Sequence, residues 1–141
     1  MTAARTLGSS DSNDMVFSAV QLPVLAPATK TAANLVVGNL TNAGRGDVLL
    51  QAEGAISKAG SSLILADTLN VQASMVGLAA PGQSWLVDLA TKINTLNLNT
   101  DGAGNVQILQ DKLAANAIAA RALVASSVVI SNGDLTIDAA G

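Results

Sequence analysis

The chain has 141 residues, a size typical of one domain, and half of them are hydrophobic. A charged fraction of 12% and a net charge of −3 argue against the dense basic surface that nucleic acids require, and the absence of Cys excludes disulfides and thiolate chemistry. High hydrophobicity with low charge also argues against disorder. With one Trp, one Phe and no Tyr, the core must consist of Val, Leu, Ile and Ala.

The N-terminal segment, 1–30, differs in pattern from the rest of the chain. Two prolines, Pro23 and Pro27, remove backbone donors there, so residues 1–30 are expected to form an N-terminal arm or cap, or an edge strand. An apolar run before the prolines supplies the candidate residues of an assembly arm, which are Val16, Phe17 and Val20. No apolar region typical of a secretory signal stands at the beginning of the chain as given.

From residue 31 onward a short phrase repeats: a turn of Gly, Asn, Asp or Ser, then four or five residues that alternate aliphatic with polar. Strand starts on one track fall at Val48, Leu69, Leu86, Val106 and Val128, with intervals of 21, 17, 20 and 22 along the sequence. A second track through Ile56, Val76, Leu96 and Leu135 has intervals of 20, 20 and 39. This period predicts that residues 31–141 form a parallel β-helix, a solenoid of about 20 residues per coil.

Alternation within the predicted strands indicates that one face of each strand is buried. Leu96 and Leu98 are expected to point inward, and Asn97 and Asn99 outward. The Gly- and Asn-containing turns also mark hairpins, so an antiparallel β-sandwich is the alternative all-β fold. The Ala-rich stretch 113–125 predicts either one short helix or a strand in a tight layer. Since no run of about 18 apolar residues occurs, membrane insertion is not expected.

Two segments carry a resemblance to a known family. They read Gly38-Asn39-Leu40-Thr41-Asn42-Ala43-Gly44-Arg45-Gly46-Asp47-Val48-Leu49-Leu50-Gln51-Ala52 and Ser131-Asn132-Gly133-Asp134-Leu135-Thr136-Ile137-Asp138-Ala139. Both resemble the repeats of filamentous-haemagglutinin-like adhesins, which are large bacterial exoproteins of two-partner secretion systems. The chain departs from those proteins in being far shorter and in lacking their secretion-domain motifs.

The resemblance implies a right-handed parallel β-helix that is extracellular or lies at the bacterial cell surface. Its implied function is structural and non-catalytic, as a rigid stalk or fibre in adhesion, aggregation or biofilm matrix. The expected partners are further copies of the chain, assembled head to tail or laterally, or a glycan or host surface. Because the open ends of a β-helix present unpaired strands, the alternative is a self-assembling extracellular filament subunit joined through its N-terminal arm or its open ends.

The residue types leave few routes to catalysis. The chain has no His, Cys or Tyr, so His-dependent triads and His or Cys metal sites are excluded. A polysaccharide-lyase-type β-helix enzyme is the second alternative, because such enzymes use Asp-bound calcium with an Arg or Lys base. The ten acidic and seven basic residues are widely scattered, however. No catalytic, cofactor-binding or metal-binding residue is therefore predicted.

Several short motifs have both a functional and a structural interpretation. Arg45, Gly46 and Asp47 form the integrin-binding tripeptide and are a candidate cell-binding site, although Gly-Asp before a strand is also the ordinary corner of this repeat. The segment 101–105 is similar to calcium-binding loops and also reads as a turn. Trp85 either covers the core or forms a sugar-stacking patch. Rows of outward Asn, Gln, Thr and Ser either dock glycans or another fibre, or stack as stabilising ladders.

Overall fold

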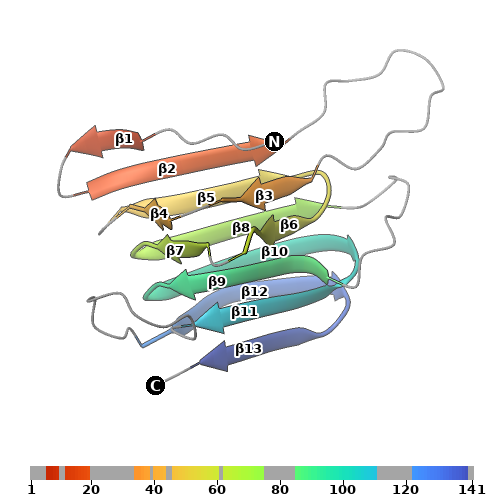
Figure 1. The fold of residues 1–141 in the computed structure, drawn as a ribbon. Helices are drawn as coiled ribbons and strands as arrows, with labels where there is room; N and C mark the ends of the chain where they lie inside the picture. Colours follow the sequence, from red (N-terminus) through yellow and green to blue (C-terminus); the bar gives the residue numbers. More distant parts are fainter. Residues whose placement is uncertain are drawn as a thin grey trace, which may run out of the picture.

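Two β-sheets make up the described part of the chain in this computed structural model (Figure 1). The structure describes residues 6–9, 12–19, 34–38, 40–43, 46–60, 62–74, 85–110 and 122–139, and every regular element among them is a strand. The strands are β1 (Thr6–Ser9), β2 (Ser12–Ala19), β3 (Leu35–Val37), β4 (Leu40–Asn42), β5 (Asp47–Ala52), β6 (Ile56–Lys58), β7 (Leu63–Leu65), β8 (Thr68–Ser74), β9 (Trp85–Lys92), β10 (Thr95–Ala103), β11 (Asn105–Gln110), β12 (Val124–Asn132) and β13 (Leu135–Ala139). The predicted all-β class is confirmed.

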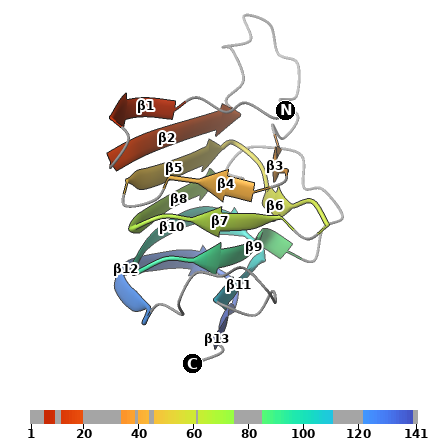
Figure 2. The same ribbon diagram turned by 60° about the vertical axis from the view of Figure 1, so that its left-hand side comes forward.

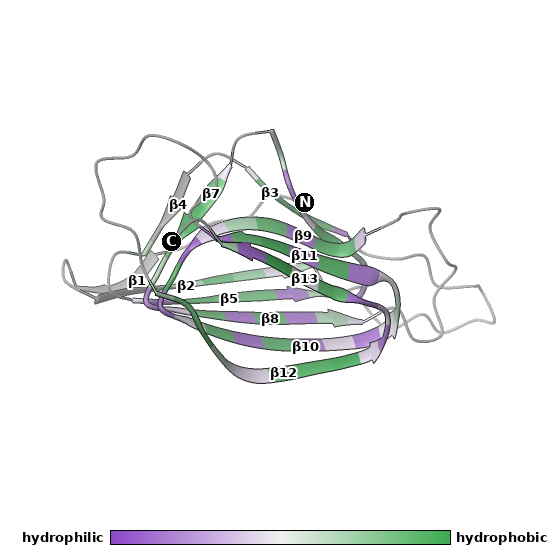
Figure 3. Cartoon of the chain, turned by 90° about the horizontal axis from the view of Figure 1, so that it is seen from below, coloured by the Kyte–Doolittle hydropathy of each residue, from purple (hydrophilic) through white to green (hydrophobic). Residues whose placement is uncertain are grey.

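Both sheets are built mostly from parallel strands. The first sheet has the order β1-β2-β5-β8-β10-β12, and the second follows the path β13-β11-β9-β6-β3. β4 also belongs to the second sheet and pairs with β7, which pairs in turn with β9 (Figure 2). From β8 onward the chain alternates between the sheets, so β8, β10 and β12 lie on one side and β9, β11 and β13 on the other (Figure 3).

The alternative of an antiparallel sandwich is wrong. Only β1 and β2 pair antiparallel, and the other pairs among the described strands are parallel. Gly102 and Gly104 have positive φ, as hairpin glycines do, but the bend they form joins β10 to β11 of the opposite sheet. Neighbours within a sheet therefore come from successive passes of the chain and run in the same direction.

The register corrects the predicted period. Paired residues are 21 apart between β5 and β8 (Asp47 and Thr68) and 27 apart between β8 and β10 (Thr68 and Thr95). They are 19 apart between β9 and β11 (Val87 and Val106). The predicted period thus describes some passes and fails for others, because the length of the segments between the sheets varies.

Each of the two predicted tracks combines strands that belong to different sheets. Leu69 of β8 lies beside Leu96 of β10, whereas the first track continued from Leu69 to Leu86, which belongs to β9 of the second sheet. Each full pass adds strands to both sheets. A regular interval between strand starts does not show to which sheet each strand belongs.

Inward side chains stack in rows between the sheets. The rows are Val48–Leu69–Leu96 and Leu50–Val71–Leu98 in the first sheet, and Ile56–Val87–Val106 and Leu89–Ile108 in the second. All of these side chains are at most 2% exposed. Burial of each such side chain contributes roughly 1.5–3 kcal/mol. The predicted alternation is confirmed, since Leu96 and Leu98 are buried while Asn97 is half-buried and Asn99 exposed.

Two further predictions concern the N-terminal segment and the Ala-rich stretch 113–125. Residues 15–19 of β2 pair in parallel with β5, and residues 12–15 of β2 pair antiparallel with β1. The division into an N-terminal arm or cap (1–30) and a repeat domain (31–141) stays a prediction. Most of the stretch 113–125, where a helix was one alternative, lies outside the described residues, and Val124 and Ala125 belong to β12.

Corners of successive passes also stack. The backbone N–H of Gly104 donates to Asn132 O (3.0 Å), and that of Asp134 donates to Asn105 Oδ1 (3.0 Å). Gly133 has a φ of 151°, and a Cβ on it would overlap the carbonyl oxygen of Gly104. Only glycine fits this conformation and this contact. Glycine is therefore required at position 133, where the last two described passes meet.

Candidate functional site: the polar outer face of the first sheet

Outward side chains of the first sheet form rows of amides. Gln51, Gln72 and Asn99 share one row because their positions are in register on β5, β8 and β10. Gln51 Nε2 donates a hydrogen bond to Gln72 Oε1 (2.7 Å). In the adjacent row, Asn97 Nδ2 donates to Asn70 Oδ1 (2.9 Å). Neighbouring strands lie about 4.8 Å apart, so equivalent amides repeat at that distance across the sheet.

The face is hollowed where β5, β8 and β10 end. A hollow of about 360 Å³ is lined by two alanines, Ala52 and Ala73, and by six polar residues, Gln51, Glu53, Gln72, Ser74, Asn99 and Asp101. A second hollow of about 80 Å³ shares Gln72 and Asn99 with the first and extends to Ser127 on β12. The two form one shallow depression across the face, which we call the amide groove.

A short pattern repeated on three strands builds the amide groove. Its copies are Gln51-Ala52-Glu53, Gln72-Ala73-Ser74 and Asn99-Thr100-Asp101. The register aligns Ala52 with Ala73 and Ala73 with Thr100. In each copy an outward amide precedes a buried small or hydroxyl residue, and a side chain bearing oxygen follows. Sequence reasoning missed this alignment because the copies are 21 and 27 positions apart, although the repeated pattern itself was visible.

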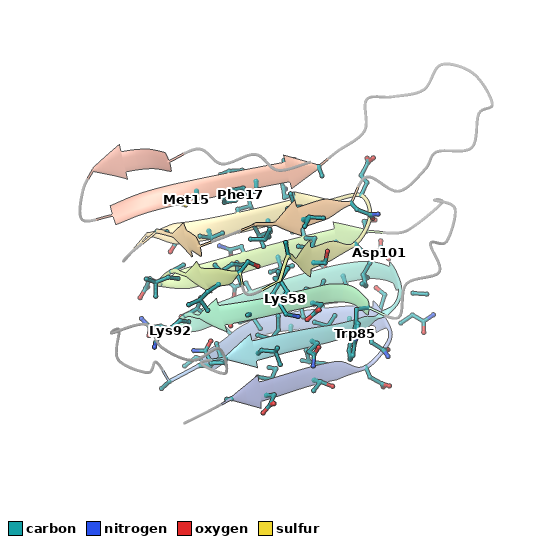
Figure 4. The ribbon with its side chains drawn as sticks, viewed as in Figure 1. Met15, Phe17, Lys58, Trp85, Lys92 and Asp101 are labelled. Atoms are coloured by element: carbon teal, nitrogen blue, oxygen red, sulfur yellow. The ribbon has the colours of Figure 1, made fainter. Side chains whose placement is uncertain are left out.

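Carboxylates stand at one end of the amide groove. Glu53 follows β5, and Asp101 lies near the C-terminal end of β10 (Figure 4). Ser131 Oγ donates to Thr100 O (3.0 Å) and lies 3.4 Å from Asp101 Oδ1, which connects β12 to this end. The described strands of the first sheet contain no Lys or Arg. The groove therefore offers neutral amides along its length and negative charge at its end.

The predicted cell-binding tripeptide lies away from the amide groove. Gly46 is buried at the corner before β5, where its N–H donates to Ala43 O (2.7 Å) and its carbonyl accepts from Asp67 N (2.9 Å). Asp47 is exposed at the beginning of β5, at the opposite end from Gln51 and Glu53. Arg45 is outside the described residues. Gly46 and Asp47 thus have the corner position that the repeat implied, and cell binding by the tripeptide stays a prediction.

The candidate assembly residues belong partly to a strand. In β2, Val16 is 41% exposed on the outer face and Phe17 is 5% exposed in the core. Val16 is in register with Leu49, and Phe17 with Leu50. Val20 lies outside the described residues. Of the two described candidates, Val16 alone presents an accessible side chain.

Other polar and aromatic groups lie on the second sheet. Lys58 Nζ is 2.6 Å from Asp88 Oδ2 and 2.7 Å from Oδ1, an ion pair that joins β6 to β9. Trp85, at the beginning of β9, is 36% exposed and in register with Asn105 (Figure 4). The segment 101–105 forms the bend from β10 to β11. Neither Trp85 nor Lys58 contributes to the wall of the amide groove.

The described residues contain neither a metal-binding cluster nor a membrane-spanning helix. They include no group of three or more Asp or Glu that could hold a metal ion. No described helix is long and apolar enough to cross a membrane. Comparison of the chain with protein-family models, curated proteins and solved structures finds no match.

Proposed function

We propose that the chain is a structural, non-catalytic segment of a secreted or cell-surface bacterial protein, a right-handed parallel β-helical rod that acts in adhesion, aggregation or biofilm matrix. One observation carries the proposal. Successive passes place strands on two sheets in turn, and their inward rows stack in register, as Val48, Leu69 and Leu96 do. A chain that stacks in this way extends by adding passes, which produces a rod.

Two further points support the proposal. About 98% of the crossover connections between parallel strands of one sheet are right-handed, which favours that hand for the β-helix. The outer face of the first sheet carries amides and hydroxyls, such as Gln72 and Asn99, which bind surfaces through hydrogen bonds and need no catalytic groups. The repeats also resemble those of filamentous-haemagglutinin-like adhesins, which have this role.

Bead adherence tests the adhesive function. Beads coated with the protein through an N-terminal tag are counted on epithelial cell monolayers, next to beads that carry Leu69→Asp. Leu69 is fully buried, so an Asp there places a charge in the core and unfolds the rod. We expect several-fold more adherence for the native chain, and equal adherence contradicts the proposal. A loss of adherence in Arg45→Ala assigns the binding to the Arg45-Gly46-Asp47 tripeptide.

A self-assembling filament subunit is the second candidate, and β12 favours it. This nine-residue strand contains no charged residue, and among the described strands it pairs with β10 alone. Val124 and Val129 on it are 60% and 54% exposed. Strand edges that are long, uncharged and rich in β-branched residues pair readily with another chain.

Light scattering over a range of protein concentrations tests the filament candidate. We expect the mass of the native chain to rise with concentration, and Val129→Lys to suppress the rise because a Lys on an edge strand opposes pairing. Gln107→Lys, on the half-buried outer face of β11 between β9 and β13, is the matched control and should not change the mass. A monomer at every concentration rules out assembly through β12.

A further inference from the structure

We propose that the amide groove binds a neutral polysaccharide chain that crosses β5, β8 and β10 on the outer face of the first sheet. The inference rests on the proposed adhesive function and names its ligand class and its location. The groove is the larger hollow of about 360 Å³ with its smaller extension, and Gln72 and Asn99 line both. These two side chains lie at the centre of the proposed site.

The amides supply the chemistry that sugar hydroxyls need. A side-chain amide has two donor positions and a carbonyl oxygen with two lone pairs, so it both donates to and accepts from a hydroxyl. The bond from Gln51 Nε2 uses one acceptor position of Gln72 and leaves its Nε2 donors for other partners. Ser74 adds a hydroxyl to the same wall. The groove can therefore form several hydrogen bonds with one sugar.

Repetition across the sheet suits a polymer. Gln51, Gln72 and Asn99 are in register on neighbouring strands, which lie about 4.8 Å apart. A polysaccharide that crosses the strands meets an equivalent amide on each of them. Weak bonds to successive sugars then add up, as in any multivalent contact.

The charge of the groove selects a neutral ligand over an acidic one. Glu53 and Asp101 line the large hollow, and the described strands of the first sheet contain no Lys or Arg. Sulfated or uronic-acid polymers would bring negative charge next to the carboxylate of Asp101, and none of these described strands supplies a cation to offset it. A neutral chain avoids this repulsion, and its hydroxyls can donate hydrogen bonds to the carboxylate of Asp101.

A stabilising ladder accounts for only part of the arrangement. It explains the bond between Gln51 and Gln72 and the bond between Asn97 and Asn70. A ladder requires neither a hollow beside the amides nor oxygen-bearing side chains at its end. The three aligned copies of the pattern that ends in Glu53, Ser74 and Asp101 supply both.

Isothermal titration calorimetry tests the proposal. The unmodified chain of 141 residues is titrated with a neutral N-acetylglucosamine hexasaccharide, with neutral dextran and with heparin. We expect at least one neutral probe to bind, and heparin not to bind. The double variant Gln72→Ala/Asn99→Ala should raise the Kd for that probe about tenfold, since it removes two hydrogen-bonding amides. Gln107→Ala is the matched control, because Gln107 is an outward amide on β11 of the second sheet, and it should leave the Kd unchanged.

A second variant fills the hollow without removing an amide. Ser74→Arg places a long side chain into the groove and should abolish binding, whereas Thr136→Arg on the exposed face of β13 should not. Circular dichroism and thermal unfolding confirm that each variant is folded. Absence of binding by both neutral probes, tighter binding of heparin, or equal Kd values for the native chain and the Gln72→Ala/Asn99→Ala variant each overturns the inference.

The bead assay separates this inference from the proposed function. If native beads adhere and beads carrying Gln72→Ala/Asn99→Ala adhere equally well, the adhesive rod stands and the amide groove is not its binding site. If native beads do not adhere, the adhesive function itself fails. Adherence lost together with hexasaccharide or dextran binding supports both.

Discussion

At the scale of single residues, Gln110 takes the place of a backbone partner. Its side chain is 1% exposed, and it bonds both backbone groups of Ile93: Nε2 donates to Ile93 O (2.8 Å), and Oε1 accepts from Ile93 N (3.4 Å). Oε1 also accepts from Thr91 Oγ1 (2.8 Å). The amide therefore pairs the backbone just beyond β9 as a neighbouring strand would.

Replacing Gln110 by Leu should destabilise the protein. The size of the side chain is kept, but the N–H and carbonyl of the fully buried Ile93 lose partners, at a cost of about 1–3 kcal/mol for each unsatisfied group. We expect the free energy of unfolding in urea to fall by roughly 3 kcal/mol. Gln107→Leu on the half-buried outer face of the same strand should change it by less than about 0.5 kcal/mol. Similar losses for both variants would contradict this role of Gln110.

Two buried threonines should respond in opposite directions to the same substitution. Thr100 Oγ1 is buried without a hydrogen-bond partner among the described residues, whereas Thr91 Oγ1 donates to Gln110. Thr100→Val removes an unsatisfied polar group and should raise the free energy of unfolding by about 1 kcal/mol. Thr91→Val removes a formed bond and should lower it by about 1 kcal/mol. Chemical denaturation measures both, and a loss in Thr100→Val would show that its hydroxyl has a partner in solution.

At the scale of elements, the strands of the first sheet differ in how many neighbours they have. β8 and β10 are flanked on both sides, while β1 at one edge and β12 at the other each have a single partner among the described strands. Amides of flanked strands exchange only when the ladder opens, and edge amides without partners exchange directly with water. Hydrogen exchange followed by mass spectrometry should therefore find β12 clearly faster than β8 and β10. Equal protection of β12 and β10 in dilute protein would show that another strand covers β12.

The faces of single strands were predictable from the sequence, and their partners were not. Side chains alternate between the two faces of a strand, and this alternation places Val106, Ile108 and Gln110 inward, so it already marks Gln110 as a buried polar residue. The same alternation places Leu98 and Asn99 on opposite faces. It contains no information about which strands pair, because pairing depends on the varying length of the segments between the strands. For this reason the amide groove, whose three copies of one pattern come together only in the correct register, was not predicted.

At the scale of the whole molecule, one pass of the chain should behave as a unit that can be added. Asp47 is in register with Thr68, so the segment 47–67 makes one complete pass. At its two ends the corners are stacked, because Asp67 N donates to Gly46 O (2.9 Å). A second copy of residues 47–67 inserted after Asp67 would place Val48 between the original Val48 and Leu69 in the same buried row.

This duplication should lengthen the molecule and leave it folded. Solution scattering is expected to show a particle longer by about 4.8 Å, the spacing between neighbouring strands. Urea unfolding is expected to show a free energy of unfolding at least equal to that of the native chain, because each repeat adds an interface with its neighbours. Duplication of residues 47–57 alone is the control. It adds only part of a pass, displaces the following strands from their sheets and should unfold the protein. If both insertions unfold it, the passes are not interchangeable units, and the β-helical rod on which the adhesive function depends must be abandoned.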